Sequence, residues 1–415
     1  MPKGRLWNRL EQWTRISHLS FPVPAHAKNL GYCLGGITLM GFSLLFLTGL
    51  VLIQFFNPQP ELANKSVHYI VEKVPAGRFL RAFHYWTAQA VVLSMCAHLL
   101  RVFITGAYKA PRILTWYLGT ALFFTAVMLS YFSGTVIKWD QEGSEALEHF
   151  EVVLGMLGPV GTLMGSGLTE SVSMNVRMYG FHIALAPLLL IVLIVGHFYL
   201  VHVFNISPLP RGPHSRLAEV PEAELTGTFM EHLLGILRFS LIFYGLVAVL
   251  AFFVPAPLGP DPSGEPTGAK PPWIYYWQYA IENFVGMPGI LYSSIVLMLL
   301  FLIVPLLDRG PSRDPKDRKG VLALGAVTLA VMIGLTIYGW MSPEQVHEGG
   351  HGHGEEETQE HTMDEMPGMS PMEETPSDHP AQDAGPAPTQ SGGKPDDHKD
   401  DGHTHQPDRK TGNGP

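Results

Sequence analysis

The sequence is poor in cysteine and in charged residues. Two cysteines occur in 415 residues, which excludes a disulfide scaffold and any cysteine-rich zinc or iron–sulfur protein. Only 15% of the residues are charged, whereas an average soluble domain carries about 25%. With 47% hydrophobic residues, the chain lacks the polar groups that cover a water-exposed surface. The composition therefore indicates an integral membrane protein.

Acidic charge is concentrated at the C-terminal end. Residues 341–415 hold 17 acidic and 4 basic residues, a net charge of −13, whereas residues 1–340 hold 19 acidic and 23 basic residues, a net charge of +4. From residue 342 onward almost no large apolar residue occurs, so this segment cannot bury a core. We expect a disordered acidic tail over residues 342–415. Its histidines and methionines, His347 and Met363 among them, suit copper, but a solvated tail without a fixed metal site is the simpler interpretation.

Long apolar runs fill most of the remaining chain. A helix needs about 20 apolar residues to cross a bilayer. Seven segments meet this requirement: Leu34–Phe56, Tyr85–Ile104, Ile113–Ile137, Tyr179–Phe204, Ile236–Val254, Ile290–Leu307 and Val321–Met341. We therefore predict an all-α integral membrane protein with about seven transmembrane helices. In residues 1–30 apolar side chains recur at helical spacing among arginines, which predicts an amphipathic helix lying in the cytoplasmic interface.

Basic residues in the short loops predict the orientation of these spans. They gather before the first span, between the second and third, and between the sixth and seventh, with Arg5, Arg101, Lys109 and Arg313 as examples. Such loops face the cytoplasm. We therefore place the N-terminus in the cytoplasm and the C-terminal tail outside, in a cytoplasmic membrane of bacterial type.

Four histidines lie inside the apolar spans. His84 and His98 are fourteen residues apart in the second span, and His182 and His197 are fifteen apart in the fourth. At about 100° per residue, fourteen steps fall about 40° short of four turns and fifteen overshoot by about 60°, so each pair lies broadly on one face. Both spans run in the same direction, which puts His84 level with His182 and His98 level with His197. Such pairs suit two bis-histidine haems, while hydrogen-bonded structural histidines are the alternative.

Small residues and one arginine accompany these histidines. Five glycines lie along the first and third spans, namely Gly35, Gly36, Gly49, Gly119 and Gly134. A flat macrocycle approaches a helix backbone where no Cβ intervenes, although close helix packing also uses small residues. Arg81 precedes His84 by one turn, where it can pair with a haem propionate or act as an ordinary interfacial arginine.

The segment from about Pro22 to Pro208 resembles the cytochrome b family, and within it the b-six type of cytochrome bf complexes. The resemblance rests on VPAHAKNLGYCLGGIT, RAFHYW, HLLRVFITGAYKAPRILTW, the WDQ that follows the third span, and the two histidines of the fourth span. It implies a dihaem four-helix bundle over residues 31–208. His84 and His182 would ligate the outer haem b, and His98 and His197 the inner one.

The resemblance extends to a third haem and to a second subunit. Cys33 falls where b-six proteins attach a haem through a single thioether, and a plain buried cysteine is the alternative. Cys96 has no assigned role. Residues 209–341 resemble, more weakly, the three-helix subunit IV that completes the b-six core. The chain would then be a fusion of the two.

The expected quinol site departs from the family pattern. The family carries a Pro-Glu-Trp-Tyr motif whose glutamate is thought to accept a quinol proton, whereas residues 271–274 read Pro-Pro-Trp-Ile. Another departure is Lys138, where the family has proline, and the third span is one residue longer. We expect the site to include Trp139, Asp140, Pro272, Trp273 and Tyr275. The sequence leaves open which group replaces the glutamate, with Asp140, Tyr275, Tyr276 and Glu282 as candidates.

Three functions follow from these patterns. The leading one is the cytochrome b subunit of a bc/bf-type quinol oxidoreductase, an enzyme complex that passes electrons from quinol through two b haems and translocates protons. It implies quinone, a Rieske iron–sulfur protein, a c-type cytochrome, lipid and a dimeric complex as partners, and no nucleic acid. The altered Pro-Pro-Trp-Ile motif favours an alternative, a dihaem anchor that links quinone to another respiratory oxidoreductase. A metal transporter with a His-rich tail is a remote third.

Overall fold

Seven apolar helices are present in the computed structural model, which describes residues 21–345. They run Leu30–Leu52, Gly77–Ile104, Ile113–Ile137, Met174–Phe204, Phe229–Phe253, Pro288–Leu307 and Lys319–Met341. The prediction of seven spans is confirmed. The expected interfacial helix, apart from its last ten residues, and nearly all of the acidic tail lie outside the described residues.

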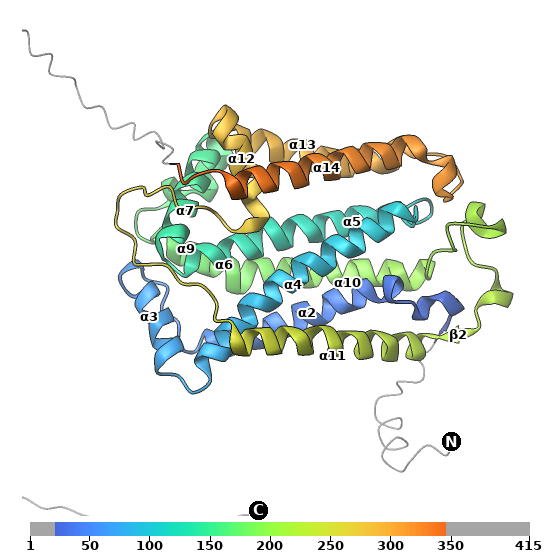
Figure 1. Cartoon of the computed structure of the whole chain (residues 1–415), viewed down its shortest axis with the longest axis horizontal. Coiled ribbons are helices and arrows are strands. Elements are labelled where there is room, and N and C mark those ends of the chain that lie inside the picture. The colour runs from blue at the N-terminus through green and yellow to red at the C-terminus, as the bar shows by residue number, and fades with distance from the viewer. Residues whose placement is uncertain (1–20, 346–415) are drawn as a thin grey trace, which may run out of the picture. The chain divides into compact units, whose positions relative to one another are not determined.

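The elements follow one another as helices joined by short connections (Figure 1). The helices that build the membrane spans are α2 (Leu30–Leu52), α4 (Gly77–Ile104), α5 (Ile113–Phe124), α6 (Phe132–Ile137), α9 (Met174–Gly180), α10 (Ala186–Phe204), α11 (Phe229–Phe253), α13 (Pro288–Leu307) and α14 (Lys319–Met341). The helices between the spans are α3 (Pro60–Glu72), α7 (Gln141–Gly155), α8 (Pro159–Met164) and α12 (Tyr276–Val285). A two-residue antiparallel pair joins β1 (Pro22–Val23) to β2 (Gly227–Thr228).

Two of the spans contain a segment of π-helix. Thr125–Tyr131, labelled η3, lies between α5 and α6, and Phe181–Leu185, labelled η5, lies between α9 and α10. Pro187 explains the second segment, because it has no N–H to donate to the carbonyl of Ile183 and so interrupts the α-helical ladder. The first segment contains no proline. The two π segments contact each other.

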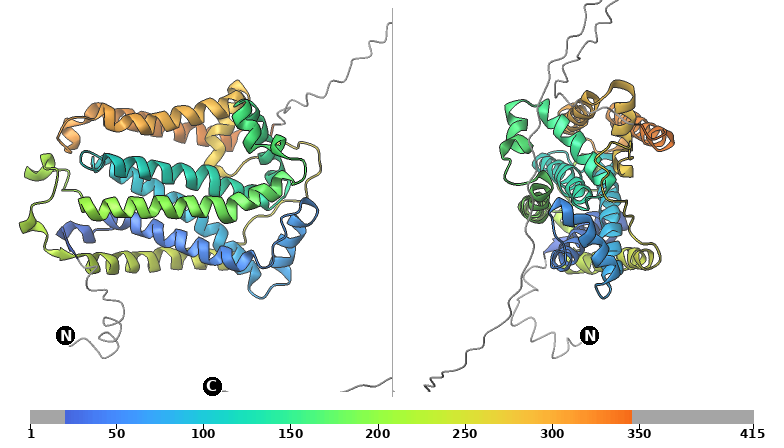
Figure 2. Two further views of the ribbon diagram at one scale, coloured as in Figure 1. Left: turned by 180° about the vertical axis from the view of Figure 1, so that it is seen from behind. Right: turned by 90° about the vertical axis from the view of Figure 1, so that its left-hand side faces the viewer.

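The helices lie side by side (Figures 1 and 2). Helix α4 packs against α2, and α11 packs against both. Helix α10 packs against α5, and α12 packs against α13 and α14. The end that carries α3, α7 and α12 is called the outer end below, and the opposite end the inner end. The first four spans thus form a bundle, and the later three cover it.

Large apolar side chains cover the outside of the helices. Leu241, Leu246 and Phe252 of α11 are 65% or more exposed, and in α14 Gly339 is the one buried residue. Such a surface is unfavourable in water and suits hydrocarbon, where the backbone groups of a helix are already paired. The protein is therefore a multi-pass membrane protein.

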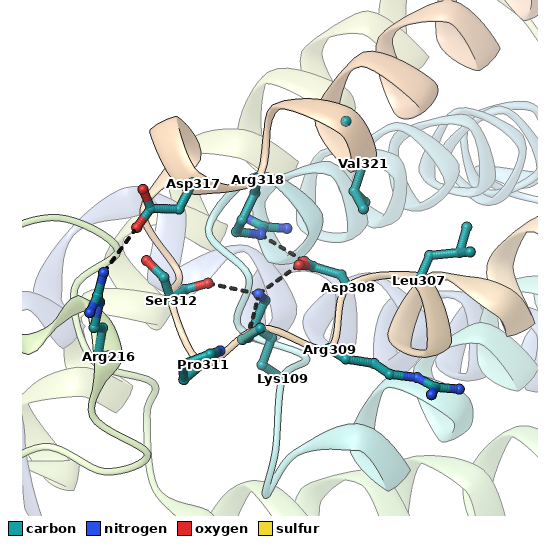
Figure 3. A pocket seen from close by; sticks show the side chains of 12 residues that line it. Lys109, Arg216, Leu307, Asp308, Arg309, Pro311, Ser312, Asp317, Arg318 and Val321 are labelled. Atoms are coloured by element: carbon teal, nitrogen blue, oxygen red, sulfur yellow. Dashed lines mark hydrogen bonds and ion pairs between the residues drawn. The ribbon is translucent and has the colours of Figure 1, made fainter.

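A buried group of charges ties the two halves together at the inner end (Figure 3). The Asp308 carboxylate forms ion pairs with Lys109 at 2.6 Å and Arg318 at 2.7 Å, and it accepts a hydrogen bond from Tyr108 at 2.6 Å. Arg318 also donates to the carbonyl groups of Phe103 and Ile104 at the end of α4. The cations hold the pKa of Asp308 below its ordinary value despite the opposing effect of burial. These contacts border a cavity of about 510 Å³.

A second set of contacts fixes the loop that follows α11 at the outer end. Arg81 donates to the carbonyl groups of Ala256 at 2.8 Å and Pro257 at 2.6 Å. Glu145 accepts hydrogen bonds from the backbone of Thr267 and Ala269, both at 2.7 Å. Although burial opposes it, these bonds lower the pKa of Glu145. The loop is therefore held against α4 and α7.

Candidate functional site

The outer histidine pair faces across the bundle. The ring centroids of His84, on α4, and His182, on η5, lie 6.4 Å apart with an interplanar angle of 67°. A metal bonded to one nitrogen of each imidazole at about 2 Å holds the two ring centroids about 6 Å apart. The separation therefore leaves room for one metal ion between the two rings.

Hydrogen bonds fix which ring nitrogen of each outer histidine carries the proton. His84 Nδ1 lies 2.8 Å from the Thr48 hydroxyl, whose own hydrogen is donated to the Leu44 carbonyl. His182 Nδ1 lies 3.0 Å from the Ser130 carbonyl and 3.1 Å from the Ser133 hydroxyl. A carbonyl only accepts, so Nδ1 must donate. Each Nε2 therefore keeps its lone pair for a metal.

The inner histidines differ in this respect. His98 lies on α4 and His197 on α10. Within the described residues the buried Nδ1 of His98 makes no hydrogen bond, whereas His197 interacts with the Thr115 backbone carbonyl. Neutral imidazoles with a free lone pair remain suitable metal ligands. In the described part of the chain no hydrogen bond from a hydroxyl group such as those of Thr48 and Ser133 reaches the inner imidazoles.

Each of the four histidines lies against one glycine. A Cβ at Gly134 would lie 2.8 Å from His182 Cε1, and one at Gly35 would lie 3.0 Å from His98 Cε1. At Gly119 the distance to His197 Cε1 is 3.4 Å, and at Gly49 the distance to His84 Cε1 is 3.6 Å. The glycines therefore make room for the imidazole rings themselves. Gly36 differs, because an added Cβ there would meet Ile236 of α11 and no histidine.

The π segments explain the unequal spacing of the histidines. In α2 and α4, which contain no π segment, the spacing is fourteen residues for Gly35 to Gly49 and for His84 to His98. Across η3 and η5 it is fifteen, for Gly119 to Gly134 and for His182 to His197. One i→i+5 turn accommodates one residue more than an α-helical turn. The π-helical turn thereby accommodates the extra residue. The two members of each spaced pair, glycine or histidine, then lie on the same face of their helix.

Cys33 is completely buried at the inner end of α2. Its Sγ lies 3.8 Å from the Ala27 carbonyl oxygen and faces Gly235 of α11, where an added Cβ would lie 3.7 Å from the sulfur. Ile236 packs in the same cluster. A haem bonded to this sulfur requires these neighbours to move, since the residue is 0% exposed. Cys96 is partly buried and free.

The expected quinol residues lie at the outer end, in different surroundings. The Asp140 carboxylate caps α7 by accepting from Gly143 N, and it also accepts from Gly259 N and Lys138 Nζ, both at 2.8 Å. Trp139 adopts a left-handed backbone with φ of 50° and packs beside α6. Burial raises the pKa of nearby Glu142, although Lys138 opposes this shift. Lys138, Asp140 and Glu142 line a cavity of about 550 Å³ with the loop after α11.

The Pro-Pro-Trp-Ile segment is anchored by a polar residue that the sequence did not single out. Trp273 Nε1 donates to Gln89 Oε1 at 2.6 Å, and Gln89 Nε2 lies 2.8 Å from the Tyr131 hydroxyl. The Tyr275 hydroxyl donates to the Val127 carbonyl at 2.7 Å. Pro272 begins the short helix Trp273–Tyr275. A glutamine within a predicted span was the available signal for this network.

Arg81 is engaged by the loop carbonyls described above, so its role toward a haem propionate stays a prediction. Among residues 21–345, no group of three or more His, Cys, Asp or Glu side chains is arranged to hold a metal ion. The histidines and methionines of the tail lie outside the described residues. In this part of the chain the candidate metal ligands are therefore the two pairs of histidines in the helix bundle.

Comparison with known proteins identifies the two halves of the chain. The family model described as cytochrome b/b6/petB matches residues 18–205, and that described as cytochrome b(C-terminal)/b6/petD matches residues 260–348. The chain is 33% identical to cytochrome b6 of Heliomicrobium gestii over 211 residues, which are 48% of this chain and 96% of that protein. It is 36% identical to cytochrome b6 of Heliobacterium mobile over 190 residues, 45% of this chain and 89% of that protein.

A solved structure shares the fold. A chain of a structure titled hyperthermophilic respiratory Complex III superposes with a TM-score of 0.67 at 21% sequence identity. The match covers 81% of this chain and 91% of that one. The arrangement of seven membrane helices is therefore a known one, and both matched halves occur here in a single polypeptide.

Proposed function

Because the chain belongs to the cytochrome b family, we propose that it is the cytochrome b subunit of a membrane quinol oxidoreductase of bc/bf type. The observation that carries the proposal is the His84–His182 pair, with ring centroids 6.4 Å apart and both Nε2 atoms left free by hydrogen bonds at Nδ1. The family binds haem b, and these residues fit it.

The four histidines hold two haems b, His84 with His182 at the outer level and His98 with His197 at the inner level. When bound, these groups supply one-electron carriers at two depths of the membrane. Thr48 and Ser133 orient the outer imidazole rings. The glycines opposite the four rings let the imidazoles sit close to the backbone of the neighbouring helices.

Quinol binds at the outer end in this proposal. Pro272, Trp273 and Tyr275 form one side of the site, and the Trp139–Asp140 region at the start of α7 forms the other. Gln89 fixes the indole of Trp273, and Asp140 holds Lys138 and the loop at Gly259 in place. Quinol protons leave on the outer side of a bacterial-type cytoplasmic membrane, with the N-terminus in the cytoplasm and the tail outside. A Rieske iron–sulfur protein and a c-type cytochrome complete a dimeric complex.

A covalent haem at Cys33 is a further part of the proposal. The YCLGG context and the place of Cys33 at the inner end support it. The burial of the sulfur, at 0% exposure, argues that any such attachment displaces Ile236 and its neighbours. The assay below counts this haem separately from the other two.

A second candidate function is a dihaem anchor that exchanges electrons between quinone and another respiratory oxidoreductase. The Pro-Pro-Trp-Ile segment, which lacks the family's glutamate, favours it. Subunits that copurify with the chain separate the two candidates. A Rieske protein supports the first, and a molybdopterin or multihaem enzyme supports the second.

A pyridine haemochrome assay on the purified complex tests the proposal, before and after acid–acetone extraction and with haem staining of the denatured chain. We expect two extractable b haems and one haem retained by the polypeptide. Two extractable haems with none retained would remove only the Cys33 attachment. Variants His84→Ala and His98→Ala should each remove one extractable haem, and a complex without b haem would refute the proposal.

A further inference from the structure

The structure narrows the groups that can receive a quinol proton in place of the missing glutamate. Three donors already occupy the Asp140 carboxylate, which is 1% exposed. Burial raises the pKa of Tyr275 and Tyr276, so both phenols stay protonated and cannot accept a proton. Of the candidates left open by the sequence, Glu282 remains.

Glu282 on α12 is paired with His149 on α7. Its side chain, on α12, is 3% exposed, and Oε1 lies 3.1 Å from Nε2 of His149 on α7. A glutamate is almost never this buried unless it is paired. The His149 side chain is 31% exposed. The pair therefore has a buried acidic end and a partly exposed basic end.

The tautomer of His149 makes this pair suited to carrying a proton. His149 Nδ1 lies 2.7 Å from the Glu145 carbonyl oxygen, which only accepts, so Nδ1 keeps its hydrogen. Nε2 is then the nitrogen that gains and loses a proton, and it faces Glu282. Burial lowers the pKa of His149, but Glu282 and the Glu145 carbonyl outweigh this effect and raise it above the ordinary value. The Glu145 carboxylate also raises the pKa of His149, and Tyr279 of α12 interacts electrostatically with Glu282.

The pair adjoins the aromatic side chains that lie beside the outer histidines. Phe150, next to His149 in the sequence, packs against Phe132 with ring centroids 5.1 Å apart. Phe132 also packs against Tyr275 at 6.3 Å, and it precedes Ser133, the hydrogen-bond partner of His182. Helices α7 and α12 thus bring the pair to the edge of the proposed quinol site.

We propose that Glu282 and His149 together receive a proton released on quinol oxidation and pass it to the outer medium. This inference rests on the proposed function. The O–H bond of the quinol breaks, and a new O–H bond forms on the Glu282 carboxylate. The proton then moves to Nε2 of His149 and leaves through its exposed side. The two electrons of the quinol go to the one-electron acceptors that the proposed function supplies.

The test uses the intact complex with Glu282→Gln, Glu282→Asp and His149→Gln. A short-chain naphthoquinol is the probe, and kcat, KM and outward proton release are measured from pH 5.5 to 9. A lost general base lowers a rate by about 10²-fold or more. We expect kcat to fall to this extent in Glu282→Gln and His149→Gln with KM changed much less. Glu282→Asp should retain most of the rate with a displaced pH profile.

Glu151→Gln is the matched control. Glu151 is a partly buried carboxylate on α7, two residues after His149, and it belongs neither to the proposed quinol site nor to the Glu282–His149 pair. Its substitution should leave kcat unchanged. Reduced-minus-oxidised haem spectra establish that each variant is assembled, and if Glu282→Gln fails to assemble, the partly exposed His149→Gln decides.

The outcomes separate the inference from the function on which it rests. If the native complex oxidises the quinol and both Glu282→Gln and His149→Gln keep the native kcat and pH profile, only the inference is overturned. Equal losses in Glu151→Gln and Glu282→Gln also overturn it. If the native complex with its haems does not oxidise any quinol, the proposed function fails and the inference fails with it.

Discussion

The contact between Gly134 and His182 predicts that alanine at this position damages the outer haem site. A Cβ at Gly134 would lie 2.8 Å from His182 Cε1, whereas a Cβ at Gly49 would meet His84 Cε1 at an ordinary 3.6 Å. The His182 ring would have to retreat by about 0.8 Å to restore the ordinary contact. Ligand geometry tolerates displacements of about 0.5 Å, and overpacking costs about 1–3 kcal/mol. Since 1.4 kcal/mol is tenfold in an equilibrium, haem affinity at this level should fall about 5- to 150-fold.

The assay is the content of extractable haem per polypeptide, together with a redox titration that resolves the two levels. Gly134→Ala should lower the occupancy of the outer level and leave the inner level intact. Gly49→Ala is the control, because it adds the same methyl group to the same level and to a membrane helix. The four alanine variants should rank Gly134, Gly35, Gly119, Gly49 in decreasing effect. A loss in Gly49→Ala equal to that in Gly134→Ala would refute the reasoning.

Four further predictions follow from contacts described above. Asp308→Asn leaves two buried cations without their carboxylate, so it should cost about 3–5 kcal/mol and lower the apparent unfolding temperature in detergent. Because the pKa of His149 is raised, its ion pair stabilises the protein fully below the ordinary histidine pKa and is lost as pH rises through the raised value. The unfolding temperature should therefore fall as pH rises above the ordinary histidine pKa of about 6.5, and fall less in His149→Gln. Thr48→Val removes the hydroxyl that accepts a hydrogen bond from His84 Nδ1, so it should raise the midpoint potential of the outer haem alone. Thr48→Ser keeps a hydroxyl there and should not change this potential. Cys33→Ala should abolish haem staining of the denatured chain and leave the extractable haems.

The sequence predicted the membrane helices and the level of each histidine, because both follow from simple periodicities. Apolar runs of about 20 residues correspond to the bilayer, and the 1.5 Å rise per residue fixes the depth of each residue. Helix ends were less accurate. The second span begins at Gly77, eight residues before the predicted Tyr85, because Arg78 and Arg81 lower the hydropathy of turns that are nevertheless helical.

Contacts between distant segments were beyond the sequence. The partners of Arg81 and Trp273 lie 175 and 184 residues away in the chain, and that of Glu282 lies 133 residues away. Hydropathy gives the depth of a residue but not the direction in which its side chain points. The π segments were also missed, although Pro187 was a visible signal for one of them. The spacing of fifteen residues was a second signal, since it fits a regular α-helix less well than fourteen.

The π segments bear on how related chains should be aligned. A one-residue insertion in a regular membrane helix would rotate everything beyond it by about 100° and separate a ligand from its partner. Here the widened turns confine the insertion to a few residues, so the ends of the helix keep their orientation. An alignment gap between a chain with fourteen residues between its histidines and one with fifteen therefore belongs at Phe181–Leu185, not at the helix ends. Spacing alone then does not distinguish two architectures, and we expect a single-residue deletion inside the segment to be tolerated.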